Sequence, residues 1–350
     1  MNSSLVTSEL DHYIEGVLGL FVIIFGIFMN SLVLLTMSKK KTNTSTSVFT
    51  TFLAAWDIGV LVTSLITIAL PNLSQWYSAE AQPYAMKYVW PVLQTARTNA
   101  IWITVLFTVS RYIATCHQLR SRIACTVSKS RKSLAVLFVV AAVMNSLRFF
   151  EQEHSPRRDK ANVNSTDEFA FNTFKYYYKG LYGVLFPTLM NFIPICVIIA
   201  LNTRLMLSTK RSMSDLGKLQ RPTKCDSRQR SLRTKKMKQC SRRMKQSVLM
   251  AILTTLLCQI PGLVYDVIFS FSLLSHNNTF TSVAFIIRNF AIPVNSVLNA
   301  YIYSWRSSKF QLILRHSMRG NTSELDDRNS KQSKPTRTKD LCINKLCTQV

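Results

Sequence analysis

The amino-acid sequence predicts an all-α membrane protein, a seven-transmembrane helix bundle with a short amphipathic cytoplasmic helix after the seventh span. Apolar residues make up 48% of the 350 and come in long blocks, with the charges between them. A helix needs about 20 such residues to cross roughly 30 Å of hydrocarbon. Basic connections also alternate with neutral or acidic ones. Seven blocks are candidate spans: Val17–Met37, Val48–Leu70, Tyr88–Val109, Leu134–Phe149, Leu181–Leu207, Val248–Leu274 and Thr281–Trp305.

The charges of the connecting segments set the expected orientation. Arg204–Lys245 carries 15 basic and 2 acidic residues, whereas Glu151–Lys179 carries 5 of each. Met1–Gly16 contains three acids and no lysine or arginine. Because lysine and arginine are retained on the cytoplasmic side, we expect the N-terminus outside. The net charge of +26 would favour nucleic acid as the partner of a soluble chain, but its placement favours a membrane and no nucleic acid.

These assignments divide the chain into parts with different expected environments. The basic cytoplasmic loop is expected to be flexible in its middle, with base-rich ends that extend the flanking helices. It either attracts anionic membrane lipid or contacts another protein. The parts are an extracellular N-terminus (1–16), the bundle (17–305) with its basic loop (208–245), the amphipathic helix (306–319) and a disordered cytoplasmic tail (320–350).

The third span is the one around which we expect the others to pack. Its only charge is Arg97, which lies 14 residues before Arg111, or about 21 Å along a helix and close to the same face. Arg97 would then point into an outer-facing cavity, with Gln94 one turn further out, and Arg111 to the cytoplasmic mouth. Two interpretations of Arg97 stay open: an internal ion pair, with Asp57 or Asp266, or direct contact with a ligand anion.

A second polar group lies deeper in the bundle. Asn30 and Asp57 are buried in the first two spans, and Asn295 and Asn299 in the seventh offer them polar partners. Asp57 either only forms hydrogen bonds to neighbouring helices or helps to form a small hydrated pocket. Such a pocket would hold a hard cation such as sodium through oxygen ligands. We expect no other cofactor and no other metal.

The sixth and seventh spans place further polar residues near the outer side. Pro261 removes a backbone hydrogen bond from the sixth span and gives it a hinge, with Gln259 just before it. Asp266 lies just over one turn outward of Pro261. Arg288 and Asn289 are expected near the outer end of the seventh span.

Short motifs outside the spans predict modifications and one partner. Each match is only a few residues long, and such matches arise often by chance. The C-terminal Thr348–Val350 fits capture of a carboxylate by a PDZ-type partner. The other matches are glycosylation at Asn2, Asn164 and Asn277 and acylation at Cys342 and Cys347.

Several stretches carry a resemblance to a known family: Asn30, Leu53–Asp57, Arg111–Arg122, Asn145–Glu151, Cys258–Pro261 and Asn295–Tyr303. With the seven spans, they resemble rhodopsin-class G-protein-coupled receptors. The Arg-Phe-Phe-Glu stretch at Arg148–Glu151 and the run that ends in Arg120–Arg122 resemble, more specifically, invertebrate FMRFamide-like neuropeptide receptors.

The resemblance implies a plasma-membrane receptor, with several passes, that binds an extracellular peptide and couples to a heterotrimeric G protein. Arg111 and Tyr112 match the pair that gates the cytoplasmic mouth and meets the G protein. Asn299 and Tyr303 match the switch in the seventh helix. The resemblance also implies that Asp57, Asn295 and Asn299 belong to a sodium-linked network.

A short amidated peptide is expected to bind in the outer cavity. A peptide ending in Arg-Phe-amide would bring a cation, for which Asp266, Glu151 or Glu153 is the natural counter-charge. Arg97 and Arg288 would instead favour a peptide with acidic residues, and the sequence leaves this open. The expected lining is Gln94, Arg97, Gln259, Asp266, Arg288 and Asn289.

The chain departs from the family pattern at four positions. Ser110 replaces the acid before the arginine, Ala300 a proline, Gln259 a tryptophan, and Met86 the outer cysteine. The alternative function is therefore a receptor-like protein with weak or constitutive signalling. A transporter or channel is less favoured because the sequence contains no internal repeat. No enzyme is expected, since phosphate-binding, metal-binding and nucleophile motifs are missing from the sequence.

Overall fold

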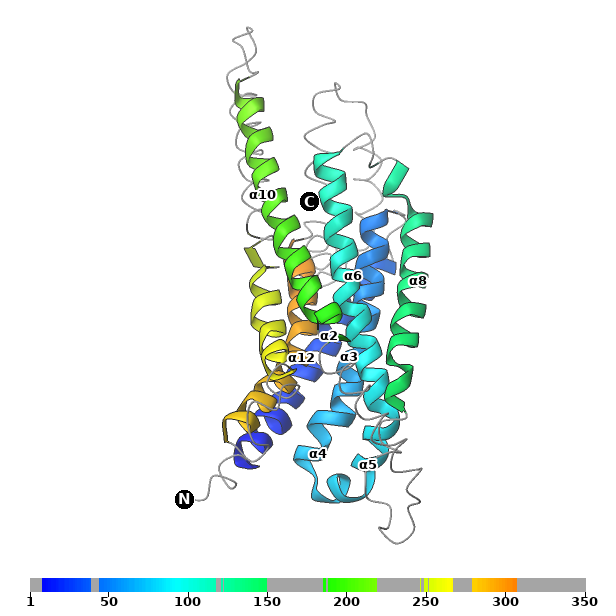
Figure 1. The fold of residues 1–350 in the computed structure, drawn as a ribbon, viewed down its shortest axis with the longest axis vertical. Helices are drawn as coiled ribbons and strands as arrows, with labels where there is room; N and C mark the ends of the chain where they lie inside the picture. The colour runs from blue at the N-terminus through cyan, green and yellow to red at the C-terminus, as the bar shows by residue number, and fades with distance from the viewer. Residues whose placement is uncertain are drawn as a thin grey trace, which may run out of the picture.

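The computed structural model describes residues 8–38, 44–117, 121, 123–149, 185–186, 188–218, 246, 249–250, 252–266 and 279–306. Every regular element in these ranges is a helix, which confirms the predicted all-α class. Seven long helices form the described bundle (Figure 1). They are α2 (Gly19–Ser38), α3 (Ser45–Ser64), α6 (Trp90–Cys116), α8 (Val127–Ser146), α10 (Ile193–Lys218), the helix Ile252–Asp266 and α12 (Thr279–Arg306).

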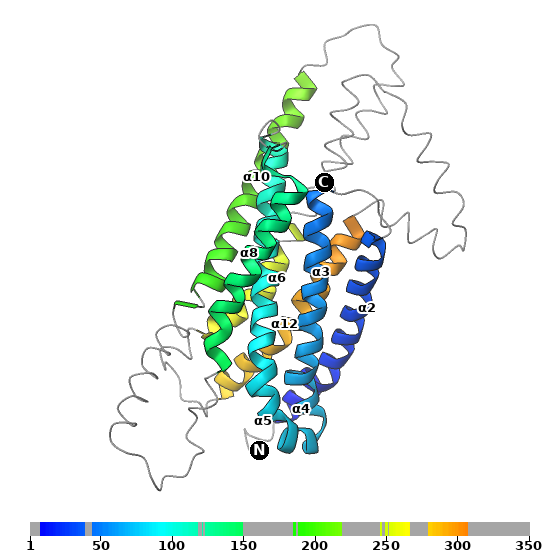
Figure 2. The same ribbon diagram turned by 90° about the vertical axis from the view of Figure 1, so that its right-hand side faces the viewer.

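Shorter elements gather at one end of the bundle, which we call the N-terminal face. Here α2 is preceded by the π-helical η1 (Asp11–Leu18), and α3 continues through η2 (Leu65–Ala69) into α4 (Leu70–Leu73). The short α5 (Gln82–Tyr84) lies at the same end (Figures 1 and 2). The C-terminal ends of α6 and α10 lie at the opposite end.

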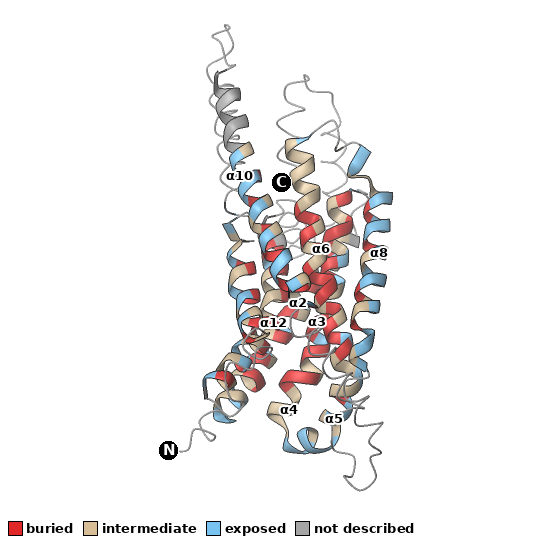
Figure 3. Ribbon diagram, viewed as in Figure 1, coloured by how far each residue is buried: buried red, intermediate tan, exposed pale blue. Residues whose placement is uncertain are grey.

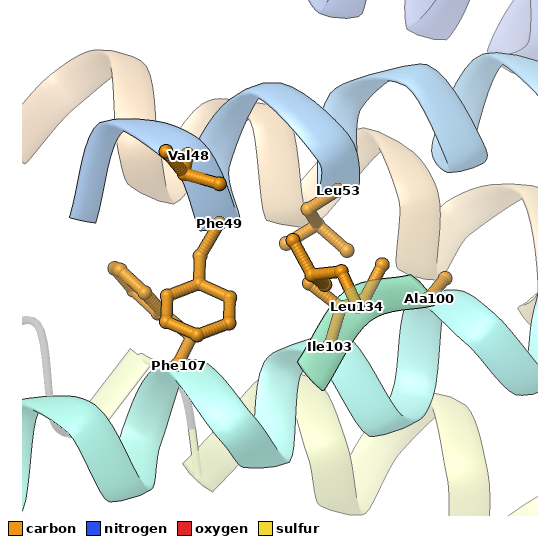
Figure 4. Close-up of a cluster of buried hydrophobic side chains, with 7 residues drawn as sticks. All are labelled: Val48, Phe49, Leu53, Ala100, Ile103, Phe107 and Leu134. Atoms are coloured by element: carbon orange, nitrogen blue, oxygen red, sulfur yellow. The ribbon is translucent and has the colours of Figure 1, made fainter. Parts of the chain in front are cut away.

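Helix α6 occupies the centre of the bundle, as predicted. It packs against α3, α8 and α10 (Figure 2). A cluster of buried apolar side chains joins α3, α6 and α8, with the rings of Phe49 and Phe107 edge to face at 6.2 Å (Figure 4). Lipid tails are as apolar as these side chains, so close packing, rather than the hydrophobic effect, is what holds them together.

Helices α2, α3 and α12 approach one another closely at Gly26. A Cβ atom on this glycine would lie 2.7 Å from Val297 Cγ2 and 2.9 Å from Leu61 Cδ1. One turn further along α2, Asn30 Nδ2 donates to the Ser296 carbonyl oxygen at 3.3 Å. A small residue followed by an interhelical hydrogen bond is the usual way for membrane helices to pack tightly.

The outer surface of the bundle is apolar, as a membrane protein requires. Helix α8 exposes valines at positions 136, 139, 140 and 143, spaced to form one stripe, and α2 exposes several phenylalanines (Figure 3). Five segments of the described chain are long and apolar enough to cross a membrane: Ser8–Met37, Ser45–Leu73, Val127–Phe149, Thr188–Ser208 and Phe280–Ile302. Helix α6 is not among them, because it carries polar side chains that the other helices surround.

Several helices extend beyond the predicted spans, two of them into segments that were assigned to the tail and the basic loop. The first helical segment begins at Ser8, ahead of the expected start at Val17, so part of the predicted N-terminal tail is helical. Helix α10 runs to Lys218 and therefore includes the start of the basic loop 208–245, whose ends were expected to extend helices. Most of that loop, the amphipathic helix beyond Arg306 and the tail 320–350 lie outside the described residues.

Candidate functional site

Buried polar side chains meet where α6, the helix Ile252–Asp266 and α12 come together. Gln94 is only 4% exposed, and Arg97 follows it by one turn on the same face of α6. Arg97 and Gln259 line an internal cavity of about 10 Å³, together with Asn295 and Ser296 of α12. This volume is enough for about one water molecule. The predicted ligand cavity is therefore nearly closed in this structure.

An ion pair closes the site toward the N-terminal face. Arg288 Nε lies 3.5 Å from Asp266 Oδ1, and Asn191 Nδ2 donates to Asp266 Oδ2 at 3.3 Å. Arg288 Nη1 also donates to Asn289 Oδ1 at 3.4 Å, and the Arg288 guanidinium lies 5.1 Å from the Tyr265 ring centroid. The Asp266 carboxylate is thus bound from both α12 and the π-helical turn η7 (Thr188–Phe192), which precedes α10.

Arg97 does not form the ion pair that the sequence left open. Asp266 interacts with it electrostatically but pairs directly with Arg288, and Asp57 belongs to a deeper network. Arg97 makes no hydrogen bond or ion pair with any residue in the described part of the chain. Gly262 leaves room for its guanidinium, since a Cβ atom there would lie 3.0 Å from Arg97 Nη2.

Among the described residues, positive charge exceeds negative charge around Arg97. Arg148, from the short helix η5 (Leu147–Phe149), Arg288 and Asp266 act on it electrostatically. The Arg148 guanidinium lies 4.7 Å from the centroid of the Phe186 ring. Two further guanidinium groups and one carboxylate of the described chain therefore act on Arg97.

Glu15 is a buried acid that the sequence interpretation missed. It is 4% exposed, and Asn72 Nδ2 donates to its Oε2 at 2.9 Å. Its Oε1 has no hydrogen-bond partner among the described residues, the Asn289 side chain lies near the carboxylate, and Arg288 interacts with it electrostatically. The sequence placed Glu15 in the outer tail because the first span was expected to start at Val17. The polar Asn72 at the end of the second span was the available signal.

A larger hollow of about 670 Å³ lies at the N-terminal face, beside His12, Asn72, Ser74 and Ser78. None of the predicted ligand-binding residues lines it. His12 Nδ1 lies 2.7 Å from the Asn72 carbonyl oxygen at its edge. This hollow is open to solvent at the face, whereas the small cavity beside Arg97 lies between the helices.

The deeper polar network is assembled as the sequence suggested. Asp57 is fully buried, and Asn299 Nδ2 donates to its Oδ2 at 3.3 Å. Ser296 lies next to the same carboxylate and links it to Asn30. Asp57 Oδ1 has no hydrogen-bond partner among the residues that the structure describes. Asn295 instead faces the small cavity.

At the opposite end of α6, Arg111 lies against an aromatic ring. Its guanidinium carbon is 4.1 Å from the Phe107 centroid, while the Tyr112 ring meets His117 edge to face at 5.8 Å. Ser110 uses its backbone carbonyl to accept a 3.6 Å hydrogen bond from Cys125 Sγ. Ala300 packs with Val33 and Ala54, and α12 is unbroken through this position.

Of the remaining predicted residues, two lie in helices that the structure describes and seven do not. Pro261 lies within the helix Ile252–Asp266, and Tyr303 lies on α12, but the structure does not describe the Tyr303 side chain. The other predicted positions lie outside the described residues: Glu151, Glu153, Asn2, Asn164, Asn277, Cys342 and Cys347.

The comparison with protein families decides the identity. Residues 29–303 match the family described as 7 transmembrane receptor (rhodopsin family). The chain belongs to this family. The seven helices of the receptor and its membrane location are thereby confirmed. Proteins of this family are receptors rather than enzymes, and they act with ligands and G proteins.

Named relatives of the receptor include several receptors of invertebrates. The FMRFamide peptide receptor frpr-18 of Caenorhabditis elegans is 27% identical over 194 residues, 54% of this chain and 45% of that one. The FMRFamide receptor of Drosophila melanogaster is 26% identical over 156 residues, 43% and 28% of the two chains. The Sex peptide receptor of the same fly is 24% identical over 220 residues, which are 57% of this chain and 48% of that one. The chain thus spans less than half the length of these curated relatives.

Proposed function

We propose that the receptor binds a short amidated neuropeptide of the FMRFamide-like kind at the plasma membrane and activates a heterotrimeric G protein. The observation that carries this proposal is the cluster of buried polar groups between α6, the helix Ile252–Asp266 and α12. The names of its relatives support a peptide as the ligand. The basic charge of Arg204–Lys245 supports the orientation, with the N-terminal face outside the cell.

Peptide binding would open the site. The cavity beside Arg97 holds about 10 Å³, so a peptide side chain enters only if the surrounding helices separate at the N-terminal face. The ion pair between Asp266 and Arg288 joins two of these helices. A ligand that binds the open state better shifts the population toward it. In that state the cytoplasmic ends of α10 and the sixth helix move apart, which exposes Arg111 and Tyr112 to the G protein.

A panel of synthetic amidated peptides tests this function in cells that express the receptor with a G-protein dissociation sensor. We expect at least one peptide to give a saturable signal. The Arg111→Ala variant should reach the cell surface and lose most of that signal, because it removes the cation that we place at the G-protein contact. The measurement is the sensor response normalised to surface expression.

The same assay distinguishes a peptide-activated receptor from the alternative, a receptor-like protein with weak or constitutive signalling. Ser110 removes the acidic partner that would otherwise restrain Arg111. A high signal without peptide, abolished by Arg111→Ala, would identify a constitutive receptor-like protein. A receptor at the surface that never signals, with or without any peptide, would exclude the proposed function.

We also propose that sodium binds beside Asp57. The Asp57 Oδ1 atom is buried without a hydrogen-bond partner among the described residues, and the side chains of Ser296 and Asn299, each of which carries an oxygen atom, lie against the same carboxylate. Carboxylate, hydroxyl and amide oxygens are the ligands that a hard cation prefers. Asn295 would complete the site from the cavity side.

Sodium is therefore expected to stabilise the purified receptor. Binding at concentrations well above the dissociation constant contributes about 1–3 kcal/mol. The Tm should rise by a few degrees in sodium chloride relative to choline chloride at equal ionic strength. Asp57→Asn should remove the difference between the salts. A difference of the same size in Asp57→Asn would locate the ion elsewhere.

A further inference from the structure

Arg97 and Gln94 point to the chemistry of the ligand. Resting on the proposed function, we propose that the peptide carries an acidic side chain, whose carboxylate is bound by the Arg97 guanidinium and the Gln94 amide. The two side chains lie one turn apart on the same face of α6, at the site where the outer cavity would open.

Both groups are donors without acceptors. Arg97 has no hydrogen bond or ion pair with any described residue, and the Gln94 Nε2 atom is buried without a partner there. Buried donors in proteins are nearly always paired, so the buried Gln94 amide nitrogen, one turn from the half-buried Arg97 guanidinium, indicates a missing acceptor. A carboxylate has two oxygens and about four acceptor positions, which matches a guanidinium and an amide.

The surrounding charge selects against a cation at this position. Arg97 and Arg288 lie beside Gly262, Arg148 also acts on Arg97, and Asp266 is the one acid of the described chain that acts on Arg97. Asp266 is already paired with Arg288 and accepts a hydrogen bond from Asn191. A peptide arginine would have to displace Arg288, whereas a peptide carboxylate meets a guanidinium that is not paired.

Binding of the acidic side chain is also linked to opening of the cavity beside Arg97. The cavity beside Arg97 is smaller than a carboxylate group, and the Arg97 guanidinium lies against Gly262, where a Cβ atom would be 3.0 Å from Nη2. The acidic side chain therefore enters as the helix Ile252–Asp266 moves away from α6. The same movement of the sixth helix is what the proposed activation requires.

The first test needs no ligand. If Arg97 serves a ligand, the Arg97→Met variant of the full-length, detergent-purified receptor should keep or raise its Tm, because a cation without a partner is removed. Asp266→Asn is the matched comparison and should lower the Tm by several degrees, since it breaks an existing ion pair. If Arg97→Met lowers the Tm as much as Asp266→Asn does, the proposal is overturned and the role of Arg97 is structural.

The second test uses two pools of synthetic amidated peptides that end in phenylalanine-amide. The pools are identical except that one has aspartate and the other asparagine at each preceding position in turn. We expect the aspartate pool to activate the receptor at concentrations at least about tenfold lower, the change expected for one charge-assisted contact. Arg97→Gln should remove this preference, so that the two pools activate the variant at similar concentrations.

The outcomes of the second test separate the two proposals. Equal potency of both pools on the unmodified receptor, or a preference that survives in Arg97→Gln, would overturn the inference but leave the peptide receptor intact. If neither pool activates a receptor that reaches the surface, the proposed function fails. The thermal comparison then decides alone whether Arg97 is structural.

Discussion

Replacement of Gly26 by leucine is expected to abolish surface expression of the receptor. The Cβ atom alone would lie 2.7 Å from Val297 and 2.9 Å from Leu61, closer than side-chain carbon atoms approach each other. Because α2, α3 and α12 meet at this point, no single side chain can move aside to make room. Overpacking of this kind typically costs about 1–3 kcal/mol, and the larger leucine should exceed that range.

Alanine substitutions provide the control for this prediction. Gly59 also lies inside a helix, but its nearest neighbour for a new Cβ atom is Ala96 Cβ at 3.8 Å, an ordinary contact. Both substitutions raise helix propensity by about 1 kcal/mol. Gly59→Ala should therefore keep or raise the Tm of the purified receptor, whereas Gly26→Ala should lower it. Equal gains in the two variants would show that the helices have room at Gly26.

Replacement of Arg288 by methionine should destabilise the N-terminal face of the bundle. It leaves the Asp266 carboxylate, only 17% exposed, without its cation. Removal of one partner from a buried ion pair costs about 3–5 kcal/mol, and partial exposure places this pair at or below the lower limit. We expect a Tm lower by several degrees, measured on detergent-purified receptor.

The double variant Arg288→Met with Asp266→Leu tests whether the loss comes from the unpaired charge. Replacement of both partners by apolar residues of similar size often restores stability. The double variant should therefore be more stable than Arg288→Met alone. Losses that simply add would mean that Arg288 and Asp266 act independently, for example through the Tyr265 ring that Arg288 also contacts.

The sequence was sufficient for the architecture because lipid imposes simple length rules on each helix. The long apolar blocks and the single charge in the third span predicted both the seven helices and the central position of α6. The family resemblance predicted that Asp57 and Asn299 come together. Their hydrogen bond spans 242 residues of sequence, so no local pattern could have shown it.

The sequence could not assign partners among the charges of the outer cavity. Arg97 and Arg288 both have long cationic side chains within reach of Asp266. Which of the two pairs with Asp266 depends on the rotation and tilt of the helices. Glu15 was missed for a different reason. A charged residue next to an apolar block marks the end of a span only if that residue is exposed. Here Asn72, from the neighbouring helix, donates a hydrogen bond to Glu15 inside the bundle.

The contact between Arg111 and Phe107 has a consequence for how this end of α6 responds to acidity. An arginine held by a carboxylate is released when that carboxylate takes up a proton. The quadrupole of an aromatic ring takes up none, so its attraction for a guanidinium persists as the surrounding solution becomes more acidic. This contact of Arg111 is therefore insensitive to proton concentration, and changes of pH leave it in place.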